Sequence, residues 1–194
     1  MATVPTQIAA MVSVYYMWRN KFTPASVLNV GVGKTAPEAY IWQWLLPDAQ
    51  LLGVDPRWSP RGNWTKQLKL PQIPVGVGDG SSTIAHYCGV CRSVKCQDQT
   101  HSKTPVPMST IDEVAKDLPG PLFMWMDIDG SEVDALRGAP KTLARTGWIN
   151  VECHAEIYGG EHAPEIDRIL LAAGYRLEYT HAGCADRLYR NMRL

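Results

Sequence analysis

The sequence has no excess charge of either sign and no apolar run long enough to cross a bilayer. Its 194 residues include 19 basic and 19 acidic side chains, so the formal net charge is zero and gives no overall attraction to nucleic acid or anionic membranes. The longest mostly apolar stretch, residues 8–18, is shorter than the roughly 20 residues of a membrane-spanning helix. It also lacks a preceding basic segment and a following cleavage site. These absences predict a soluble, cytoplasmic, single-domain protein without a membrane or nucleic-acid partner.

Two phosphate-binding signatures are also incomplete. Lys34 follows Gly33, but the upstream glycine spacing of a P-loop is missing. The third glycine of the dinucleotide fingerprint is absent as well, because Ala36 and Pro37 stand there. The turn is therefore not a P-loop, and NAD is disfavoured. A nucleoside cofactor without pyrophosphate needs no such cradle, and S-adenosylmethionine is the common one.

The same region does contain a strand–turn–helix–strand pattern. Residues 26–33 read as a buried strand running into a glycine turn, and residues 37–46 as a helix with proline in its first turn. Residues 50–54 form a further strand that ends in Asp55. This order is typical of nucleotide-binding βαβ units, in which glycines let the backbone approach a ligand and the acid accepts hydrogen bonds from two ribose hydroxyls. The predicted glycines are Gly31 and Gly33.

A second βαβ unit places acidic residues at strand ends. A buried strand at 122–126 is followed by Asp127 and Asp129, and after a helix at 132–145 the strand at 148–151 is followed by Glu152 and His154. Such crossovers make strands parallel, so their carboxyl ends share one edge of the sheet. Ligands bind at that edge in open α/β sheets. We therefore expect the carboxylates and the imidazole to converge on a site.

The remaining segments complete a sheet protein. Residues 6–21, within an N-terminal segment 1–22, predict a helix that is apolar nearly all round, packed on the sheet edge or forming a homodimer contact. The turn at Asp79, between strands at 73–77 and 83–87, either borders an adenine ring or is a plain hairpin turn. A helix at 163–173 and two strands at 175–179 and 186–191, expected to be antiparallel, close the chain.

Residues 88–107 form a Cys/His-rich insertion loop. Cys88, Cys91, Cys96 and His101 follow the spacing C-x2-C-x4-C-x4-H, which offers four ligands for a structural zinc ion. A disulfide from Cys88 or Cys91 to Cys96 would staple the same loop, and the thiols can equally stay reduced. The spacing leaves these three states open.

The segment 126–139, Met-Asp-Ile-Asp-Gly-Ser-Glu-Val-Asp-Ala-Leu-Arg-Gly-Ala, resembles the core motif of the FkbM-type S-adenosylmethionine-dependent methyltransferases, K-(I/L/V)-D-(I/L/V)-E-G-x-E-x-x-(L/V)-L-x-G. Asp129 replaces the usual Glu, and Met126 replaces the usual apolar residue or Lys. The positions that agree with the motif are Asp127, Gly130, Glu132, Leu136 and Gly138. The resemblance extends over about residues 26–190 and leaves out the Cys/His-rich loop.

Three further elements are similar to the family. Residues 150–154 resemble its V-E-x-H element, and residues 53–56 resemble its F-E-P, with Asp55 as the ribose-binding acid. Residues 27–33 resemble its first motif, with Asn29 where Asp is usual. The cofactor-binding residues predicted from pattern and resemblance together are Asn29, Gly31, Gly33, Asp55, Asp79, Asp127 and Asp129.

The resemblance implies an α/β, Rossmann-like class I methyltransferase fold. Its mostly parallel seven-stranded sheet would have helices on both faces and an antiparallel C-terminal strand pair. It also implies S-adenosylmethionine as cofactor and O-methylation of a small molecule or saccharide. Methyl transfer from a sulfonium is an in-line displacement, so the protein supplies positioning and a base. His154 is the natural base by pKa, with Asp127 or Glu152 orienting it or accepting the proton. Alternatively, Asp127 and Glu152 hold a divalent cation such as magnesium.

Two other functions compete with this interpretation. An RNA ribose 2′-O-methyltransferase uses a Lys-Asp-Lys-Glu tetrad, for which Lys21 or Lys34, Asp127, Lys141 and Glu152 are the candidates. The mid-helix position of Lys141 and the zero net charge argue against it. A non-catalytic module that binds a nucleoside or a partner would use the same fold without chemistry.

Overall fold

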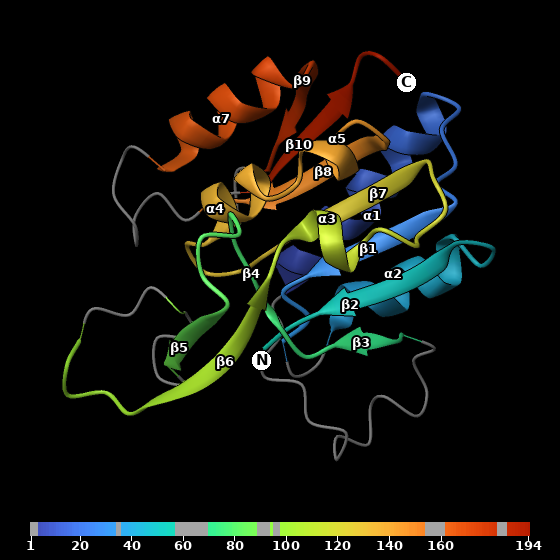
Figure 1. Ribbon diagram of the computed structural model, residues 1–194. Helices are drawn as coiled ribbons and strands as arrows, with labels where there is room; N and C mark the ends of the chain where they lie inside the picture. Colours follow the sequence, from blue (N-terminus) through green and yellow to red (C-terminus); the bar gives the residue numbers. More distant parts are fainter. Residues whose placement is uncertain are drawn as a thin grey trace.

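The computed structural model describes residues 4–33, 36–56, 70–88, 94, 98–153, 162–181 and 186–194. Seven strands in this part of the chain form one sheet in the order β3-β2-β1-β7-β8-β10-β9 (Figure 1). The first five strands of that order run parallel, and β10 is antiparallel to both of its neighbours. The predicted mostly parallel sheet with an antiparallel C-terminal pair is therefore confirmed. The elements are α1 (Val4–Arg19), β1 (Ser26–Val30), α2 (Pro37–Leu45), β2 (Gln50–Val54), β3 (Gln72–Ile73), β4 (Gly76–Val77), β5 (Ile84–Cys88), β6 (Lys103–Ser109), α3 (Ile111–Val114), β7 (Leu122–Met126), α4 (Glu132–Arg137), α5 (Pro140–Leu143), β8 (Thr146–Glu152), α7 (His162–Ala172), β9 (Tyr175–Thr180) and β10 (Asp186–Asn191).

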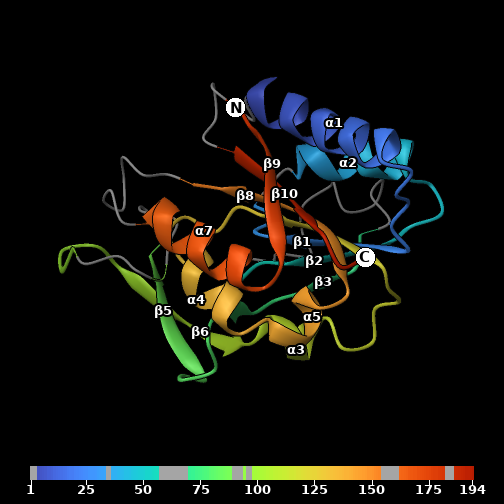
Figure 2. The same cartoon turned by 90° about the horizontal axis from the view of Figure 1, so that it is seen from above.

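The central strand β7 divides the core into two layers. All five of its residues are buried, and their side chains alternate between the two faces of the sheet. Leu122, Met124 and Met126 belong to the apolar cluster under α3, α4, α5 and α7. Phe123 and Trp125 belong to the cluster under α1 and α2. Figure 2 shows these two groups of helices on opposite sides of the sheet, as predicted.

The helix predicted over 132–145 is two short helices. α4 ends at Arg137 and α5 begins at Pro140, whose ring cannot continue the preceding helical turn. The carboxylate of Asp112 accepts hydrogen bonds from the backbone N–H groups of Lys141 and Thr142, and so satisfies the start of α5. The chain therefore turns between α4 and α5, which the sequence pattern predicted as one continuous helix.

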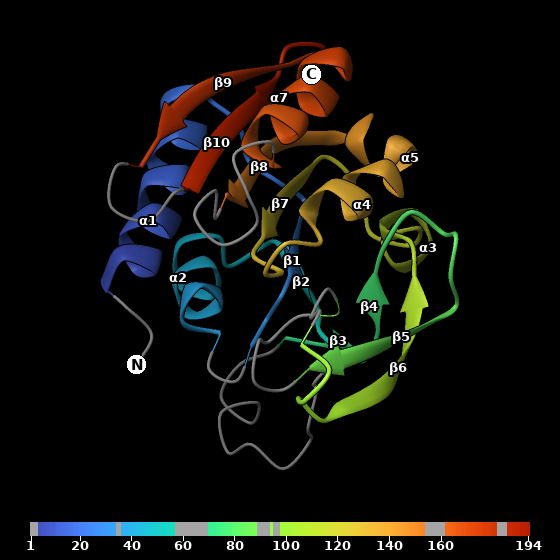
Figure 3. The same cartoon turned by 90° about the vertical axis from the view of Figure 1, so that its left-hand side faces the viewer.

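A second, three-stranded sheet has the order β4-β6-β5 and extends away from the main sheet (Figures 1 and 3). Its strand β6 was not predicted, and residues 103–107 of the predicted insertion loop belong to it. Pro105 and Pro107 are tolerated there because β4 pairs only with Met108 and Ser109, which leaves residues 103–107 paired on one side alone. The hairpin alternative for the turn at Asp79 is wrong, since β4 and β5 each pair with β6 and not with each other.

Helix α1 covers the sheet with one face and exposes apolar residues on the other. Its buried residues include Ala10, Val14 and Met17. Ile8, Met11, Tyr15 and Trp18 are between 44% and 55% exposed and follow a spacing of three and four residues, so they form one stripe. Packing on the sheet is thus observed, and the homodimer contact stays a prediction. No helix in the described ranges has the length and apolar character that a bilayer crossing requires.

Candidate functional site

A cavity of about 450 Å³ lies at the carboxyl ends of β1, β2 and β7. Strand β1 is followed through α2 by β2 on one side and borders β7 on the other, so the cavity occupies the point where the strand order reverses. This is the position at which open α/β sheets bind ligands. The lining residues are Val30, Gly31, Val54, Asp55, Pro56, Val75, Gly76, Val77, Tyr87, Val94, Asp127, Ile128, Asp129 and Ser131.

Gly31 is required by the packing of the sheet itself. The residue has φ +93°, and a Cβ built on it would lie 1.7 Å from the carbonyl oxygen of Asp127. Its N–H donates to the carbonyl of Val54, while the N–H of Asp127 donates to that of Val30. The ends of three strands therefore meet at one point without a side chain between them. From the sequence, Gly31 was predicted to let the backbone approach a ligand closely. The close approach observed is between two strand ends.

Asp55 joins the end of β2 to the glycine turn. Its carboxylate is 2% exposed, and Oδ2 accepts a hydrogen bond of 2.8 Å from the backbone N–H of Gly33. The two groups are 22 residues apart in the sequence. The turn and the acid that the nucleotide-binding pattern predicted are thus brought together at the cavity.

Asn29 lies below the cavity and does not line it. Its side chain is fully buried, and Nδ2 donates to Oε1 of Glu38 across 2.8 Å. Burial raises the pKa of Glu38 to about 7, although the hydrogen bond from Asn29 opposes the shift. Asp127 adds a repulsive charge. Glu38 was not predicted as a buried residue, because a glutamate in the first turn of a helix usually lies in solvent. The one signal in the sequence was Asn29, which stands where the resemblance led us to expect an acid.

Asp127 and Glu152 lie at the ends of neighbouring strands, since Met126 pairs with Val151. Burial raises the pKa of Glu152 well above its usual range, and the side-chain hydrogen bond with Asp127 raises it further. The charges of Asp186 and Asp129 act in the same direction. The hydrogen bond between the carboxyl groups of Glu152 and Asp127 requires one proton, which the pair shares. Two of the predicted catalytic residues meet as expected, and His154 lies outside the described residues.

Glu132 organises the loop between β7 and α4. It is buried, and Oε1 accepts hydrogen bonds of 3.2 Å from the backbone N–H groups of Ile128 and Gly130. Oε2 lies 2.7 Å from Nε2 of His162 at the start of α7. The loop that bears Asp129, with φ +50°, is thus held from below. His162 was given no role from the sequence, because its partner is 30 residues away.

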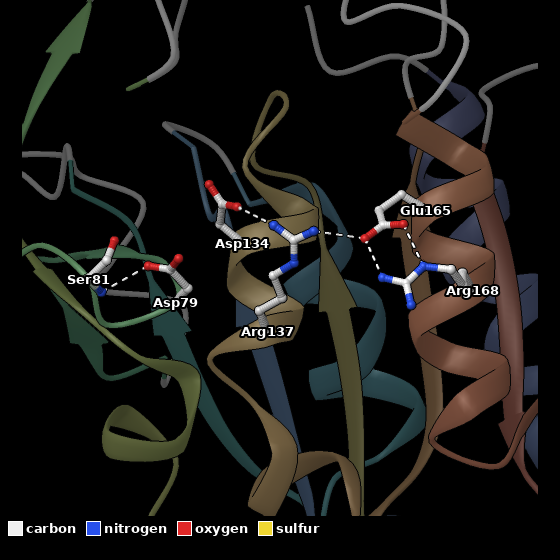
Figure 4. A network of polar contacts seen from close by, with 6 residues as sticks. All are labelled: Asp79, Ser81, Asp134, Arg137, Glu165 and Arg168. Carbon is white, nitrogen blue, oxygen red and sulfur yellow. Dashed lines mark hydrogen bonds and ion pairs between the residues drawn. The ribbon is translucent and has the colours of Figure 1, made fainter.

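Asp79 lies in a turn that does not line this cavity. Its Oδ1 accepts a 2.9 Å hydrogen bond from the N–H of Ser81 (Figure 4), and its side chain lines a second cavity with Thr110 and Lys141. Figure 4 also shows Arg137 between Asp134 and Glu165. The pair with Glu165 joins α4 to α7, whereas the pair with Asp134 lies within α4. Both are partly exposed, so their contribution to stability is small.

Of the lysines proposed for the RNA-methylation tetrad, the two that the structure describes, Lys21 and Lys141, do not meet at Asp127. Lys141 lines the second cavity, whereas Asp127 lines the first. Lys21 precedes the amino end of β1, opposite the edge that carries Asp127; the neighbouring Phe22 packs on Gly147 near the start of β8. Lys34 lies outside the described residues.

Two members of the predicted zinc set are described. Cys88 is buried, and its Sγ lies 3.6 Å from Nδ1 of His101. Cys91 and Cys96 lie outside the described residues. Among residues 4–33, 36–56, 70–88, 94, 98–153, 162–181 and 186–194, no three His, Cys, Asp or Glu side chains form a group able to hold a metal ion.

The comparisons with known proteins agree with this architecture. A family model described as the methyltransferase FkbM domain matches residues 59–177. No curated protein sequence matches the chain significantly.

Three solved structures share the fold. A methyltransferase FkbM from Methylobacillus flagellatus KT is 14% identical, with a TM-score of 0.56, over 86% of this chain and 43% of that one. A magnesium protoporphyrin IX methyltransferase from Synechocystis PCC 6803 with bound SAM is 11% identical, with a TM-score of 0.51, over 96% and 78%. A precorrin-6y C5,15-methyltransferase from Geobacter metallireducens GS-15 is 12% identical, with a TM-score of 0.50, over 97% and 87%. The part of the Methylobacillus flagellatus KT protein that this chain covers is thus less than half of its length.

Proposed function

The chain belongs to the FkbM methyltransferase family, and we propose that it transfers the methyl group of S-adenosylmethionine to a hydroxyl of a small molecule or saccharide. One observation carries the proposal: the cavity at the switch point of the sheet is bordered by the buried Asp55 on one side and by Asp127 on the other. In this proposal Asp55 would bind the ribose, and Asp127, with Glu152 as its hydrogen-bonded neighbour, would handle the proton.

The cavity suits a nucleoside cofactor in its chemistry. Asp55 would accept hydrogen bonds from the ribose hydroxyls, and the apolar side chains of Val54, Val75 and Tyr87 would border the adenine. Asp127 and Asp129 would bring negative charge toward the positively charged sulfonium and amino groups of the cofactor. Asn29 would act from below, by supporting the glycine turn through Glu38.

The carboxyl pair supplies the proton chemistry. The cofactor brings an activated methyl group, so the protein must align the acceptor hydroxyl and remove its proton. In this proposal Asp127 and Glu152 share one proton, and the pair accepts a hydrogen bond from the substrate hydroxyl. In this proposal the hydroxyl proton passes to the group formed by Asp127, Glu152 and His154. The part of His154 rests on the sequence alone.

A divalent cation at Asp127 and Glu152 is the second mechanism to test. The hydrogen-bonded pair supports it, because a cation can replace the shared proton and acidify a bound hydroxyl. Activity that disappears with EDTA and returns with magnesium would favour the cation. Activity that is indifferent to EDTA would leave the proton-transfer mechanism.

Titration calorimetry with S-adenosylhomocysteine tests the proposal first. We expect micromolar binding to the wild-type chain, followed by transfer of labelled methyl to members of a panel of sugars and small hydroxylated metabolites. Absence of binding would contradict the cofactor assignment. Binding without transfer, together with pathway activity that survives Asp127→Ala and His154→Ala, would favour the non-catalytic binding module.

An RNA substrate remains the enzymatic alternative. It requires labelled methyl to appear on RNA and to depend on Lys141, which lines a different cavity from Asp127. The same labelled-methyl assay with a transcript as acceptor tests it. Because the chain spans less than half of the FkbM structure, the acceptor should also be screened with any longer natural form.

A further inference from the structure

Helix α1 presents a stripe of large apolar side chains to solvent, and Figure 2 shows this helix on the outer side of the sheet. The residues of this α1 stripe, each between 44% and 55% exposed, are Ile8, Met11, Tyr15 and Trp18. No residue from 4 to 18 is charged. A helix face in contact with water normally carries charged side chains. The absence of charge therefore indicates that another apolar surface covers the stripe.

The spacing of the α1 stripe favours a helix as the covering element. Its residues are separated by three, four and three positions, which is the a and d pattern of a helix that packs along another helix. This spacing places the four side chains within an arc of about 80° around the helix. A helix that lies on a membrane surface has a broader apolar face flanked by lysine and arginine. The basic residue in α1 is Arg19, at its last position.

The order of the side chains along the stripe is complementary to itself. Two flexible aliphatic residues, Ile8 and Met11, are followed by two aromatic residues, Tyr15 and Trp18. An antiparallel pair of α1 helices, with a two-fold axis at the level of residue 13, would place Ile8 against Trp18 of the second copy. Met11 would then meet Tyr15 of that copy. Each aliphatic side chain would pack on a ring, and a thioether makes favourable contacts with aromatic rings.

The position of Arg19 also favours the antiparallel arrangement. In a parallel pair the two guanidinium groups would lie side by side and repel each other. An antiparallel pair separates the two Arg19 positions by about 18 Å along the helix. That separation exceeds the screening length of about 8 Å at physiological ionic strength. A second copy in this orientation therefore brings no like charges together.

The stripe rests on ordered aromatic packing. The rings of Tyr15 and Tyr16 meet edge to face with centroids 5.7 Å apart. Tyr16 in turn contacts the ring of the buried Trp148 and that of Tyr179. Because these contacts hold Tyr16 in place, Tyr15 has little conformational freedom to lose on association. A side chain ordered in advance lowers the entropic cost of binding.

The apolar area is close to what a dimer needs. Helix α2 packs beside α1, and its Trp44 is 77% exposed. Trp44 faces away from the sheet, because it lies about 200° around the helix from the buried Trp42. Together with the α1 stripe it offers on the order of 600 Å² per copy. Interfaces of standard size bury about 800 Å² per partner, so we expect a dimer of micromolar affinity.

We propose that the α1 stripe is the interface of a homodimer, in which α1 packs antiparallel on α1 of a second copy about a two-fold axis at the level of residue 13. None of residues 4–19 lines the cavity at the carboxyl ends of β1, β2 and β7. The dimer is therefore independent of the proposed methyl transfer, and both copies would keep the cavity open to ligands.

Sedimentation velocity across the micromolar range tests the dimer. We expect wild type to dimerise, and Met11→Glu and Tyr15→Glu each to raise the dissociation constant about tenfold or more, because a charge would enter the apolar seam. The matched control is Leu171→Glu, since Leu171 is 55% exposed on α7, on the other face of the sheet. This variant should dimerise like wild type. Circular dichroism checks that all three variants are folded.

Cross-linking through introduced cysteines tests the orientation. A mixture of Met11→Cys and Tyr15→Cys chains should form a disulfide between the two copies on mild oxidation. Neither variant alone should do so, because the antiparallel pair offsets identical positions along the helix axis. Wild type, which has five cysteines of its own, gives the background. Cross-linking of either variant with itself, without cross-linking in the mixture, would contradict the antiparallel arrangement.

Three further results would overturn the proposal. One is a wild-type chain that stays monomeric throughout the micromolar range. Another is a dimer that survives both glutamate substitutions, which would place the interface elsewhere. The third is a monomer that floats with anionic phospholipid vesicles and loses this binding in Tyr15→Glu, because the stripe would then be a membrane-binding face. None of these measurements needs a cofactor, so a dimer that never binds S-adenosylhomocysteine would refute the proposed function alone.

Discussion

The backbone N–H of Gly33 donates to Oδ2 of Asp55 across 2.8 Å. This hydrogen bond joins the glycine turn after β1 to the end of β2. The same carboxylate has to serve the turn and, in the proposed function, the ribose. Its two tasks can be separated by substitution, because an amide oxygen keeps the acceptor for Gly33 and removes the charge.

Asp55→Ala should abolish measurable binding of S-adenosylhomocysteine, since it removes both the ribose acceptor and the hydrogen bond to the turn. Asp55→Asn should retain the fold and weaken binding by about 1.5–3 kcal/mol, the usual range for a hydrogen bond to a charged group. Calorimetry measures both. The control is Asp48→Ala, an exposed residue before the same strand. Equal binding of S-adenosylhomocysteine by wild type and Asp55→Ala would contradict the assignment of Asp55 as the ribose-binding acid.

Glu152→Gln should leave S-adenosylhomocysteine binding nearly unchanged and lower kcat by about 10²–10⁴-fold. Glutamine can still donate a hydrogen bond to Asp127, but it carries no transferable proton. Single-turnover methyl transfer to an acceptor found by screening gives the rate. Glu113→Gln, on the exposed face of α3, is the control. A kcat equal to that of wild type would exclude Glu152 from proton handling.

Gly31→Ala should destabilise the protein by more than about 2 kcal/mol, because a side chain at φ +93° is strained and its Cβ would meet the Asp127 carbonyl. The midpoint of urea unfolding measures the change. Gly78→Ala is the matched control: its Cβ would lie 3.3 Å from the flexible end of Met108. Similar midpoints for the two variants would show that the strand ends are not packed this tightly.

Glu38→Gln tests the buried carboxyl below the turn. The pKa of Glu38 is raised from 4.5 to about 7 in the folded protein, so between these values the folded state binds more protons than the unfolded chain. Wild-type stability should therefore fall as pH rises through this window, by up to roughly 3 kcal/mol. Glutamine should remove the part of this dependence that comes from Glu38 and leave the part that comes from the raised pKa of Glu152. Denaturant unfolding at pH 5 and pH 8 compares the two, and equal pH dependence in both would contradict a buried, protonated Glu38.

Local patterns predicted most of the architecture. Apolar runs at residues 50–54 and 122–126 identified β2 and β7 with the bounds observed, since a strand buried on both faces leaves a continuous apolar stretch. Patterns failed where a distant partner decides the structure. Strand β6 exists because β4 and β5 pair with it despite its prolines, and no feature of its own sequence announces that pairing.

The residues of the candidate site were also predicted only where local sequence decides their position. Asp55, Asp127 and Glu152 were predicted because each directly follows a strand, and the strand order places those ends together. Glu38 and His162 were not, because their partners, Asn29 and Glu132, meet them only through the packing of helices on the sheet. Acids at the ends of strands are thus visible in the sequence, whereas Glu38 and His162, which contact buried partners, are not.

The alternation along β7 has a consequence for how the molecule unfolds. Met124 anchors the helices on one face and Phe123 those on the other, through adjacent peptide units of the same strand. Neither layer can separate without exposing the strand on which the other depends. The two layers are therefore one cooperative unit, and the cavity at the carboxyl ends of β1, β2 and β7 should exist only while both are intact.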